Sequence, residues 1–359
     1  MDKERSTQFM LKLVDHVGTA LAAALLVVGD RSGLFKAMAG AGPLSPSALA
    51  ARSAISARYV EEWLAVMTGA GYVEHDPEAD TFSLPDEHAV FLTDESSEYY
   101  LGGLFQGLPG LLAMTPRLVD AFKTGAGVSF AEFGSDLPRS LEAMNRSVYE
   151  SRLVRSWLPT MPEVVAALQR GGRALDVGCG TGVVPITLAK AFPTATVAGL
   201  DLDARSIEIA RGHARKAGLE DRVDFRAAPV EAVPTEPGWD FISTFDVIHD
   251  LPDPLGALTR IRAALNEGGT YLMVEPKVAD DLEKNMKNPF ARMLYGISCL
   301  HCVPQSLAQG GPGLGACWGE RRARDMAEQA GFARFDRLDI RSPALAFYAL
   351  RTADSSARV

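Results

Sequence analysis

The 359-residue sequence is poor in cysteine and has no excess of positive charge. Four cysteines in a chain of this length do not indicate a disulfide scaffold, and they favour a reducing compartment. The 45 acidic residues outnumber the 36 basic ones, which gives a net charge of −9. Because contacts with phosphate depend on clustered lysine and arginine, this charge argues against a nucleic-acid partner.

Internal repeats, low-complexity tracts and a long hydrophobic run are missing as well. The apolar stretch 17–28 is shorter than the roughly 20 residues that span a bilayer. It begins late and follows Asp15 and His16, which is unlike a signal peptide. We therefore expect a cytoplasmic protein without a membrane partner, and a buried helix over 17–28 that packs against a partner subunit.

A glycine-rich turn directly after a short apolar strand is the most informative feature that the sequence does contain. The strand is predicted over 173–177, and the glycines that follow it are Gly178, Gly180 and Gly182. Glycine tolerates positive φ and lets a ligand approach the main chain closely. The helix predicted over 183–192 would direct its N-terminus at that ligand.

A second predicted strand, 195–200, ends in Asp201, where a carboxylate can bind both hydroxyls of a ribose. Strand, glycine turn, helix, strand and acid together indicate the nucleoside-binding half of a doubly wound sheet. A dinucleotide fingerprint would place its third glycine at Val183, so this pattern does not match one. Asp176, inside the first strand, suits a cationic ligand better than a pyrophosphate.

The acid-x-Gly-x-Gly-x-Gly pattern of 176–182 resembles motif I of class I S-adenosylmethionine (SAM) methyltransferases. The resemblance implies that Asp176 and the glycine turn hold the methionine part of SAM and that Asp201 holds its ribose. The other residues expected to line the cofactor are Cys179, Leu202, Ala228, Pro229, Phe245 and Asp246. Many family members have a Gly-Asp pair after the third strand, and its Asp binds the adenine amino group. Here residues 227–229 are Ala-Ala-Pro, so adenine would be held by backbone atoms, by apolar contacts or by Glu231.

Strands and helices continue to alternate after Asp201, and the order resembles the seven-stranded class I methyltransferase sheet, whose last strand is antiparallel. The further strands are predicted over 223–226, 240–244, 268–275, 335–340 and 345–350, with helices over 204–217, 255–265 and 321–330. We therefore expect an α/β, Rossmann-like domain over 171–359.

Residues 44–85 have the pattern of a winged helix, with helices over 45–51 and 57–69 and strands over 71–75 and 81–84. Its basic residues are Arg52 and Arg58, against the acids Glu61, Glu62, Glu74, Asp76, Glu78 and Asp80. Such a surface would be repelled by phosphate, so a dimerisation or lid role is favoured over DNA binding.

We expect the chain to have three parts. Residues 1–85 form a helix and a winged-helix dimerisation domain, residues 86–170 form a mostly helical linker or lid broken at 107–110 and 125–127, and residues 171–359 form the methyltransferase-like domain.

His249 is the candidate general base. It follows the fourth strand at the carboxyl edge of the sheet, and imidazole accepts protons near neutral pH. Residues 248–253 resemble the His-Asp segment of winged-helix small-molecule O-methyltransferases, which implies that His249 is the base and that Glu275, after the fifth strand, orients it.

An alternative leaves His249 a structural role in shaping the following helix. Asp250 and Asp253 are interpreted as cap or turn carboxylates. Glu320 is an imperfect match to the family's second acidic partner, because its spacing is off by several residues.

Residues 290–319 lie where this family inserts substrate-binding structure, and they predict a helix over 290–303 followed by a glycine-rich loop over 310–319. The substrate candidates are Met144, Tyr295, His301 and Trp318. Cys299, His301, Cys302 and Cys317 lack the spacing of a structural zinc site, so no metal is expected.

The sequence as a whole predicts SAM-dependent methyl transfer to a small-molecule nucleophile, with S-adenosylhomocysteine as product. Oxygen is favoured over nitrogen or sulfur, because a phenol gains more from a base than a thiol does. A homodimer through the N-terminal domain is expected. The alternatives are a SAM-sensing winged-helix transcriptional regulator and a thiol S-methyltransferase.

Overall fold

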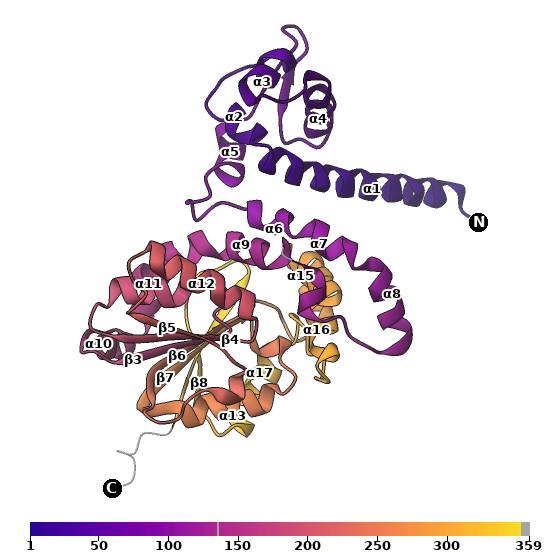
Figure 1. Ribbon diagram of the computed structural model, residues 1–359. Coiled ribbons are helices and arrows are strands. Elements are labelled where there is room, and N and C mark those ends of the chain that lie inside the picture. Colours follow the sequence, from indigo (N-terminus) through magenta and orange to yellow (C-terminus); the bar gives the residue numbers. More distant parts are fainter. Residues whose placement is uncertain (135, 353–359) are drawn as a thin grey trace. The chain divides into compact units, whose positions relative to one another are not determined.

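The computed structural model describes residues 1–134 and 136–352 and divides the chain into two compact units, drawn in Figure 1. The first unit comprises Met1–Leu112 and Ser135–Val148, and the second comprises Ala113–Gly134 and Tyr149–Val359. The helical stretch expected over 86–170 is therefore shared between the units.

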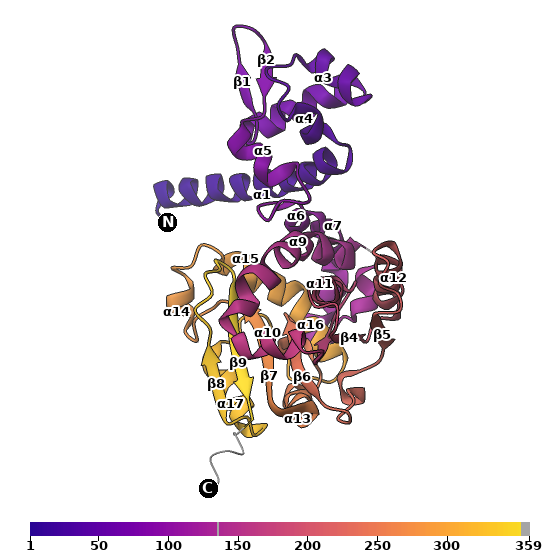
Figure 2. The same cartoon turned by 90° about the vertical axis from the view of Figure 1, so that its left-hand side faces the viewer.

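The first unit contains the winged helix predicted from the sequence. Ser45 caps α3 (Pro46–Ser53) by accepting a hydrogen bond from the Ala48 amide, and α4 (Ala57–Gly69) follows. Strands β1 (Glu74–Asp76) and β2 (Thr81–Ser83) form the antiparallel hairpin visible in Figure 2. Helices α2 (Leu34–Met38) and α5 (Asp86–Leu92) flank this core, in which the rings of Phe35 and Trp63 meet edge to face.

Helix α1 (Lys3–Arg31) differs from the expected buried helix. Its buried residues are confined to the last third, namely Ala22, Leu26, Val27 and Gly29. Large apolar side chains before them are exposed, including Val14 at 64% and Leu21 at 62%. The helix is also longer than the apolar stretch 17–28, and among the described residues it is the one helix with the length and composition to cross a bilayer.

The remaining helices of the first unit are α6 (Gly102–Gln106), α7 (Leu108–Ala113) and most of α9 (Asp136–Arg152). The break predicted at 107–110 is present only at Gly107, between α6 and α7, because Pro109 and Gly110 lie within α7. Proline is tolerated in the first turn of a helix, where its missing N–H has no partner anyway.

The second unit is built on a seven-stranded sheet of order β5-β4-β3-β6-β7-β9-β8. The strands are β3 (Arg173–Val177), β4 (Thr196–Asp201), β5 (Val223–Ala227), β6 (Trp239–Phe245), β7 (Leu265–Pro276), β8 (Arg334–Arg337) and β9 (Leu345–Arg351). Only β9 runs antiparallel to its neighbours β7 and β8, and the other pairs are parallel. The α/β fold class and the antiparallel last strand are confirmed.

Helices cover both faces of this sheet (Figure 1). One face carries α10 (Pro162–Gln169), α11 (Val183–Ala191) and α12 (Ala204–Lys216), and the other carries α13 (Pro254–Ala264) and α17 (Glu320–Gln329). Parallel strands covered on both faces read as continuous apolar runs, as 173–177 does.

Between β7 and α17 the chain forms α14 (Leu282–Asn285) and then one long helix in three parts: α15 (Ala291–Ile297), a π turn η6 (Ser298–Cys302) and α16 (Val303–Ala308). The predicted helix over 290–303 is therefore confirmed and runs five residues further. A π turn inside a helix is frequent at functional sites. Residues 310–319 form the predicted irregular loop.

The segment Ala113–Gly134 packs on this long helix within the second unit. It contains α8 (Thr115–Thr124), the break predicted at 125–127, and η1 (Phe130–Phe133). The Val128 amide donates to the Pro304 carbonyl at 3.0 Å. A Cβ at Gly127 would lie 1.9 Å from the Ala308 nitrogen, so only glycine permits this approach.

Candidate active site

Parallel strands bring their carboxyl ends to one edge of the sheet. Here β3 is followed by the glycine turn, β4 ends in Asp201, β6 in Phe245, and β7 carries Glu275 next to its last residue. The strand order reverses between β3 and β6, where ligands bind in open α/β sheets.

The glycine turn has left-handed backbone at Gly178, Gly180 and Gly182, with φ of 73°, 51° and 84°. A Cβ at Gly182 would lie 2.6 Å from the Phe225 ring, so this glycine is required by packing between α11 and β5. A Cβ at Gly180 would meet no atom within 4 Å. The main chain at Gly180 therefore borders open space that a ligand can enter.

Asp201 is held in place by the turn itself. Its Oδ2 accepts from the Gly180 amide and its Oδ1 from the Asp203 amide, both at 2.8 Å. Burial raises the pKa of Asp201, and these two backbone bonds oppose the rise. Each carboxylate oxygen can accept a second hydrogen bond, so the group keeps acceptor capacity for hydroxyls.

Asp176 lies within β3, 3% exposed, and its Oδ1 accepts from the Ser243 hydroxyl at 2.7 Å. Burial raises the pKa of Asp176 to about 8, although the bond from Ser243 lowers it. The carboxyl is therefore mostly neutral at pH 7 without a cation nearby, and a cationic ligand would favour its ionised form.

The structure brings most other expected cofactor residues to the same edge. The Ala228 amide donates to the Asp201 carbonyl at 2.9 Å, which places Ala228 beside the expected ribose carboxylate. Pro229 follows it on the surface, and Cys179 is buried in the glycine turn. Leu202, directly after Asp201, is 63% exposed.

Asp246 has left-handed backbone, with φ of 56°, which is strained for any residue other than glycine. Its amide donates to the Val274 carbonyl at 2.9 Å, while its Oδ1 is buried without a partner among the described residues. Burial raises the pKa of Asp246 to about 7. Strain and an unsatisfied carboxylate together make Asp246 a candidate functional residue.

An aromatic cluster lies beside this position. Phe245 packs at 4.8 Å from the Tyr149 ring and 6.0 Å from the Trp157 ring. The Tyr149 hydroxyl is buried and finds no partner in the described chain. No signal in the sequence separates Tyr149 from the many other apolar side chains over 86–170, because only the fold brings it to the end of β6.

His249 and Glu275 form a buried pair, each 2% exposed. The imidazole Nδ1 is bonded to Glu275 Oε2. Glu275 also accepts from the Ile248 amide and the Trp318 indole N–H, both at 3.1 Å. These donors fix the carboxylate, which in turn fixes Nδ1 as the protonated nitrogen and leaves Nε2 to act.

The Nε2 side of His249 faces two further groups. Asp250 Oδ1 lies 3.3 Å from Nε2, and the Cys302 thiol lies within 4.8 Å of a ligand atom of each of these two residues. Burial opposes a charge on His249, but the carboxylates of Glu275 and Asp250 and the bond to Cys302 outweigh it and raise its pKa well above the usual range. The sequence did not indicate that Asp250 and Cys302 would lie beside Nε2 of His249.

Of the two predicted cap residues, Asp253 caps α13 by accepting from the Gly256 amide. Asp250 does not cap it, because its side chain turns toward His249. Glu320 is held by Arg324 and Arg337 in an ion-pair network. It is therefore not a second acid on the imidazole.

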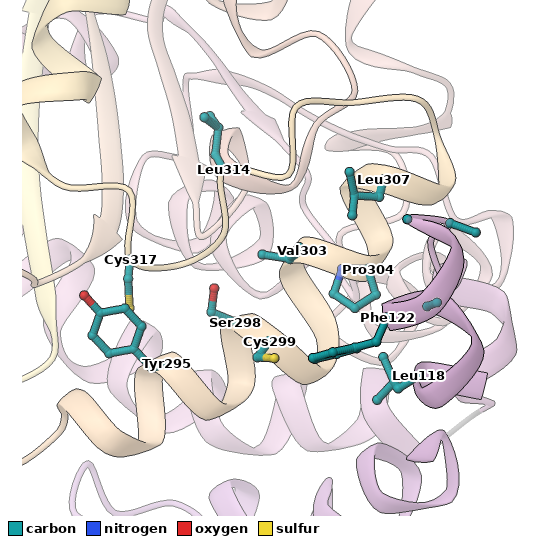
Figure 3. Close-up of a pocket in the computed structure, with 13 residues that line it drawn as sticks. Leu118, Phe122, Tyr295, Ser298, Cys299, Val303, Pro304, Leu307, Leu314 and Cys317 are labelled. Atoms are coloured by element: carbon teal, nitrogen blue, oxygen red, sulfur yellow. The ribbon is translucent and has the colours of Figure 1, made fainter. Parts of the chain in front are cut away.

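A cavity of about 510 Å³ opens between α8 and the long helix (Figure 3). Its lining is mainly apolar and includes Leu118, Phe122, Tyr295, Ser298, Cys299, Val303, Pro304, Leu307, Leu314 and Cys317. Two lining residues neighbour members of the His249 site in the sequence, since Cys317 precedes Trp318 and Ser298 begins the turn that ends in Cys302. The volume suits a small organic molecule.

The four substrate candidates lie in different surroundings. Tyr295 lines the cavity and its hydroxyl accepts from Asn285. His301 is buried against the rings of Phe130 and Phe133, with Nδ1 unpartnered among the described residues. Trp318 is bonded to Glu275 instead of lining the cavity, and Met144 lies on α9 in the first unit.

Comparison with known sequences agrees with this architecture. A family described as a methyltransferase domain matches residues 168–331, and one described as an Rv2258c-like winged HTH domain matches residues 20–94. The chain therefore carries a methyltransferase domain with the fold of SAM-dependent methyltransferases. It joins that domain to an N-terminal winged-helix domain.

Among curated relatives, the ubiquinone biosynthesis O-methyltransferase of Bordetella avium is 36% identical over 114 residues, which are 31% of this chain and 45% of that protein. The chain thus matches less than half of the relative's length.

Two solved structures share the fold over nearly the whole chain. The mitomycin 7-O-methyltransferase MmcR is 18% identical with a TM-score of 0.67, covering 98% of this chain and 100% of that one. Human N-acetylserotonin methyltransferase, solved in complex with SAM, is 18% identical with a TM-score of 0.64, covering 98% and 99%. At this level of sequence identity, the comparison with solved structures shows a shared fold and nothing more.

Proposed function

We propose that this protein is a SAM-dependent methyltransferase that acts on a hydroxyl of a small organic molecule. The observation that carries the proposal is the buried His249–Glu275 pair at the edge of the sheet that also holds the glycine turn. The names of the relatives and of the solved structures favour oxygen as the acceptor atom.

SAM would supply an electrophilic methyl group on a sulfonium. Three groups have the chemistry to hold SAM. The main chain at Gly180 is open to a ligand, Asp176 is a buried acid that a cation would ionise, and Asp201 is an acceptor for ribose hydroxyls. The adenine would lie near Ala228 and Pro229, without an acidic partner from the third strand. The walls of this cofactor site would be completed by Gly178, Cys179, Gly182, Phe245 and Asp246, with Leu202 at its rim.

His249 would take the proton of the acceptor hydroxyl on Nε2. Glu275 keeps Nδ1 protonated, so that the ring accepts at Nε2 alone, and Trp318 and Ile248 hold Glu275 in place. When bound, SAM would supply the methyl group to the deprotonated acceptor oxygen and would leave as its neutral thioether, S-adenosylhomocysteine. Asp250, 3.3 Å from Nε2, stabilises the imidazolium that results.

The acceptor would occupy the 510 Å³ cavity, whose apolar lining favours an aromatic or hydrophobic molecule. Tyr295 is the lining residue placed to direct a polar substituent, and His301 remains a candidate contact. A thiol acceptor is the second enzymatic possibility, and the same cavity would hold it.

The exposed apolar side chains of α1 support a homodimer through the N-terminal unit. Met10, Val14, Val17, Leu21 and Val28 recur along one stripe of the helix, as in a coiled-coil seam. The composition of the chain and its free cysteines fit a cytoplasmic location.

A SAM-sensing regulator is not favoured. In the helix that would read DNA, Arg58 is engaged by Glu61 and Glu62, and the hairpin beside it is acidic. Phosphate would meet negative charge across this surface.

The proposal is tested by incubating the protein with SAM and panels of phenols, amines and thiols, followed by mass spectrometry. The mass gain of one methyl group on hydroxyl acceptors, lost in His249→Ala, is the expected result. Methyl transfer to thiols or amines alone, with hydroxyls inert, would contradict the oxygen preference.

A further inference from the structure

Three side chains with metal-ligand chemistry converge at the end of β6. His249 and Asp250 lie in η5 (Ile248–Asp250), and Cys302 comes from the π turn of the long helix, far along the chain. Their ligand atoms all lie within 4.8 Å of one another, and His249 and Cys302 are buried. The sequence shows no metal motif here, because the members are brought together only by the fold.

In the absence of a cation the three side chains are joined by hydrogen bonds of the Cys302 thiol with His249 and Asp250, and each offers a lone pair to a cation once it is deprotonated. Because Glu275 is bonded to Nδ1 of His249, Nε2 is the ring nitrogen that can offer a lone pair to a cation once its proton has left. Asp250 Oδ1, 3.3 Å away, is buried and has no hydrogen-bond partner among the described residues. A cation between them would satisfy both acceptors.

The geometry and the ligand types match zinc. Two ligands bound at roughly 2.0–2.2 Å to a tetrahedral zinc lie about 3.3–3.6 Å apart, and the Nε2–Oδ1 separation is 3.3 Å. Zinc accepts nitrogen, carboxylate and thiolate ligands together.

The surroundings match as well. A metal-binding histidine nearly always donates its other ring N–H to a carboxylate, a backbone carbonyl or water, as His249 does to Glu275. Asp246 adds a further carboxylate whose charge acts on this group.

We propose that His249, Asp250 and Cys302 form a binding site for a zinc-class divalent cation, which inhibits the enzyme by occupying Nε2 of His249. Binding releases the thiol proton of Cys302 and the Nε2 proton of the protonated His249 ring to solvent, and it involves no oxidation or reduction. The inhibition rests on the proposed role of His249 as base, whereas the binding of the ion does not.

The test uses the full, tag-free protein after dialysis against a chelator, titrated with Co²⁺ as a spectroscopic substitute for zinc. Thiolate ligation gives an intense near-ultraviolet charge-transfer band. We expect one equivalent of Co²⁺ to produce this band and one equivalent of Zn²⁺ to remove it. Absence of a saturable band in protein that still shows its native circular dichroism would overturn the proposal.

Variants assign the ligands. Cys302→Ser should abolish the band, while Cys299→Ser, an exposed cysteine of the same helix, should keep it. Glu275→Gln should weaken Co²⁺ binding about 10–100-fold by removing the carboxylate behind the ring. A band that survives Cys302→Ser with unchanged affinity would place the ion elsewhere and refute the site.

Asp250→Asn gives a second check that does not alter the thiol, and we expect it to weaken Co²⁺ binding at least tenfold. Unchanged affinity would remove Asp250 from the ligand set and contradict the proposed geometry. Because all these readouts need neither SAM nor an acceptor, failure of metal binding is distinguishable from failure of the proposed methyl transfer.

Discussion

His249 lies between two carboxylates, with Glu275 on Nδ1 and Asp250 3.3 Å from Nε2. Such an arrangement suits a base whose protonated form must be stabilised during the reaction. It also means that the ring must be neutral before it can accept a proton, which ties the rate to pH.

Replacement of His249 tests its role as base. His249→Ala should lower the maximal rate about 10²–10⁴-fold, the usual contribution of a positioned acid–base group, with binding of S-adenosylhomocysteine changed less than threefold. Rates come from single-turnover mass spectrometry and affinities from calorimetry. An unchanged maximal rate with every acceptor would leave His249 only a structural role.

The pH dependence follows from the direction of the His249 pKa shift. The carboxylates raise this pKa well above its usual value, so the neutral, proton-accepting ring is populated only at higher pH. The maximal rate with a phenol should therefore rise with pH through and beyond pH 7, and Asp250→Asn should move the rise to lower pH. A profile already flat from pH 6 would contradict this account.

Asp176 makes the stability of the cofactor-free protein depend on pH. Its pKa is raised to about 8 in the folded protein from 3.8 in the unfolded chain, so the folded state retains a proton that the unfolded state loses. The unfolding free energy should fall as pH rises from about 4 to about 8. Denaturant titrations at several pH values should show that the unfolding free energy of Asp176→Asn falls less with pH than that of the wild type. The same pH dependence in both proteins would refute the raised pKa of Asp176.

The residue types of the site were more predictable from the sequence than their partners. Asp176, Asp201, His249 and Glu275 each lie at or near the end of a strand, so the strand pattern alone brings them to one edge. Cys302 and Tyr149 could not be found in this way, because their approach depends on how helices pack on that edge.

At the scale of elements, the glycine turn combines two requirements. Gly182 is needed for packing against Phe225, whereas Gly180 faces open space and must admit a ligand. Both have positive φ, so the sequence pattern alone does not separate them.

Gly180→Ala tests this distinction, with Gly218→Ala as a matched control. Both glycines have positive φ, and a Cβ at either position would meet open space, so each substitution should cost about 1–2 kcal/mol of stability. Only Gly180→Ala should also lower affinity for S-adenosylhomocysteine, by tenfold or more. Equal affinities in the two variants, measured by calorimetry, would place the cofactor away from the turn.

Local signals predicted most elements of the sheet and of the winged helix, because caps, turn glycines and apolar strands are encoded nearby in the chain. The π turn at 298–302 was not predictable, since it depends on packing within the fold. The break expected at 107–110 is shorter than predicted and confined to Gly107, because Pro109 and Gly110 lie in the first turn of the next helix.

At the scale of the whole molecule, α1 is the feature that the described chain leaves unexplained. The stretch 17–28 was predicted to be a buried helix that packs against a partner subunit, and in a single chain Val17, Leu21 and Val28 are exposed. The stripe therefore calls for a partner surface, and a second copy of this chain is the proposed one.

Charges placed on the stripe should separate the subunits. Val14→Asp with Leu21→Asp is expected to convert a dimer of twice the 38.5 kDa chain mass into a monomer, since each buried apolar side chain contributes about 1.5–3 kcal/mol. Thr19→Asp, on the opposite side of the helix, is the control and should remain dimeric. Light scattering after size-exclusion chromatography gives the masses, and a monomeric wild-type protein would refute the proposal.

The most direct measurement of the central claim is calorimetric titration of the purified protein with SAM and with S-adenosylhomocysteine, beside Asp201→Ala. The account predicts saturable one-to-one binding of both ligands, in the micromolar range, and its collapse in the variant. Absence of binding in folded wild-type protein would contradict the account, as would an affinity that Asp201→Ala leaves unchanged.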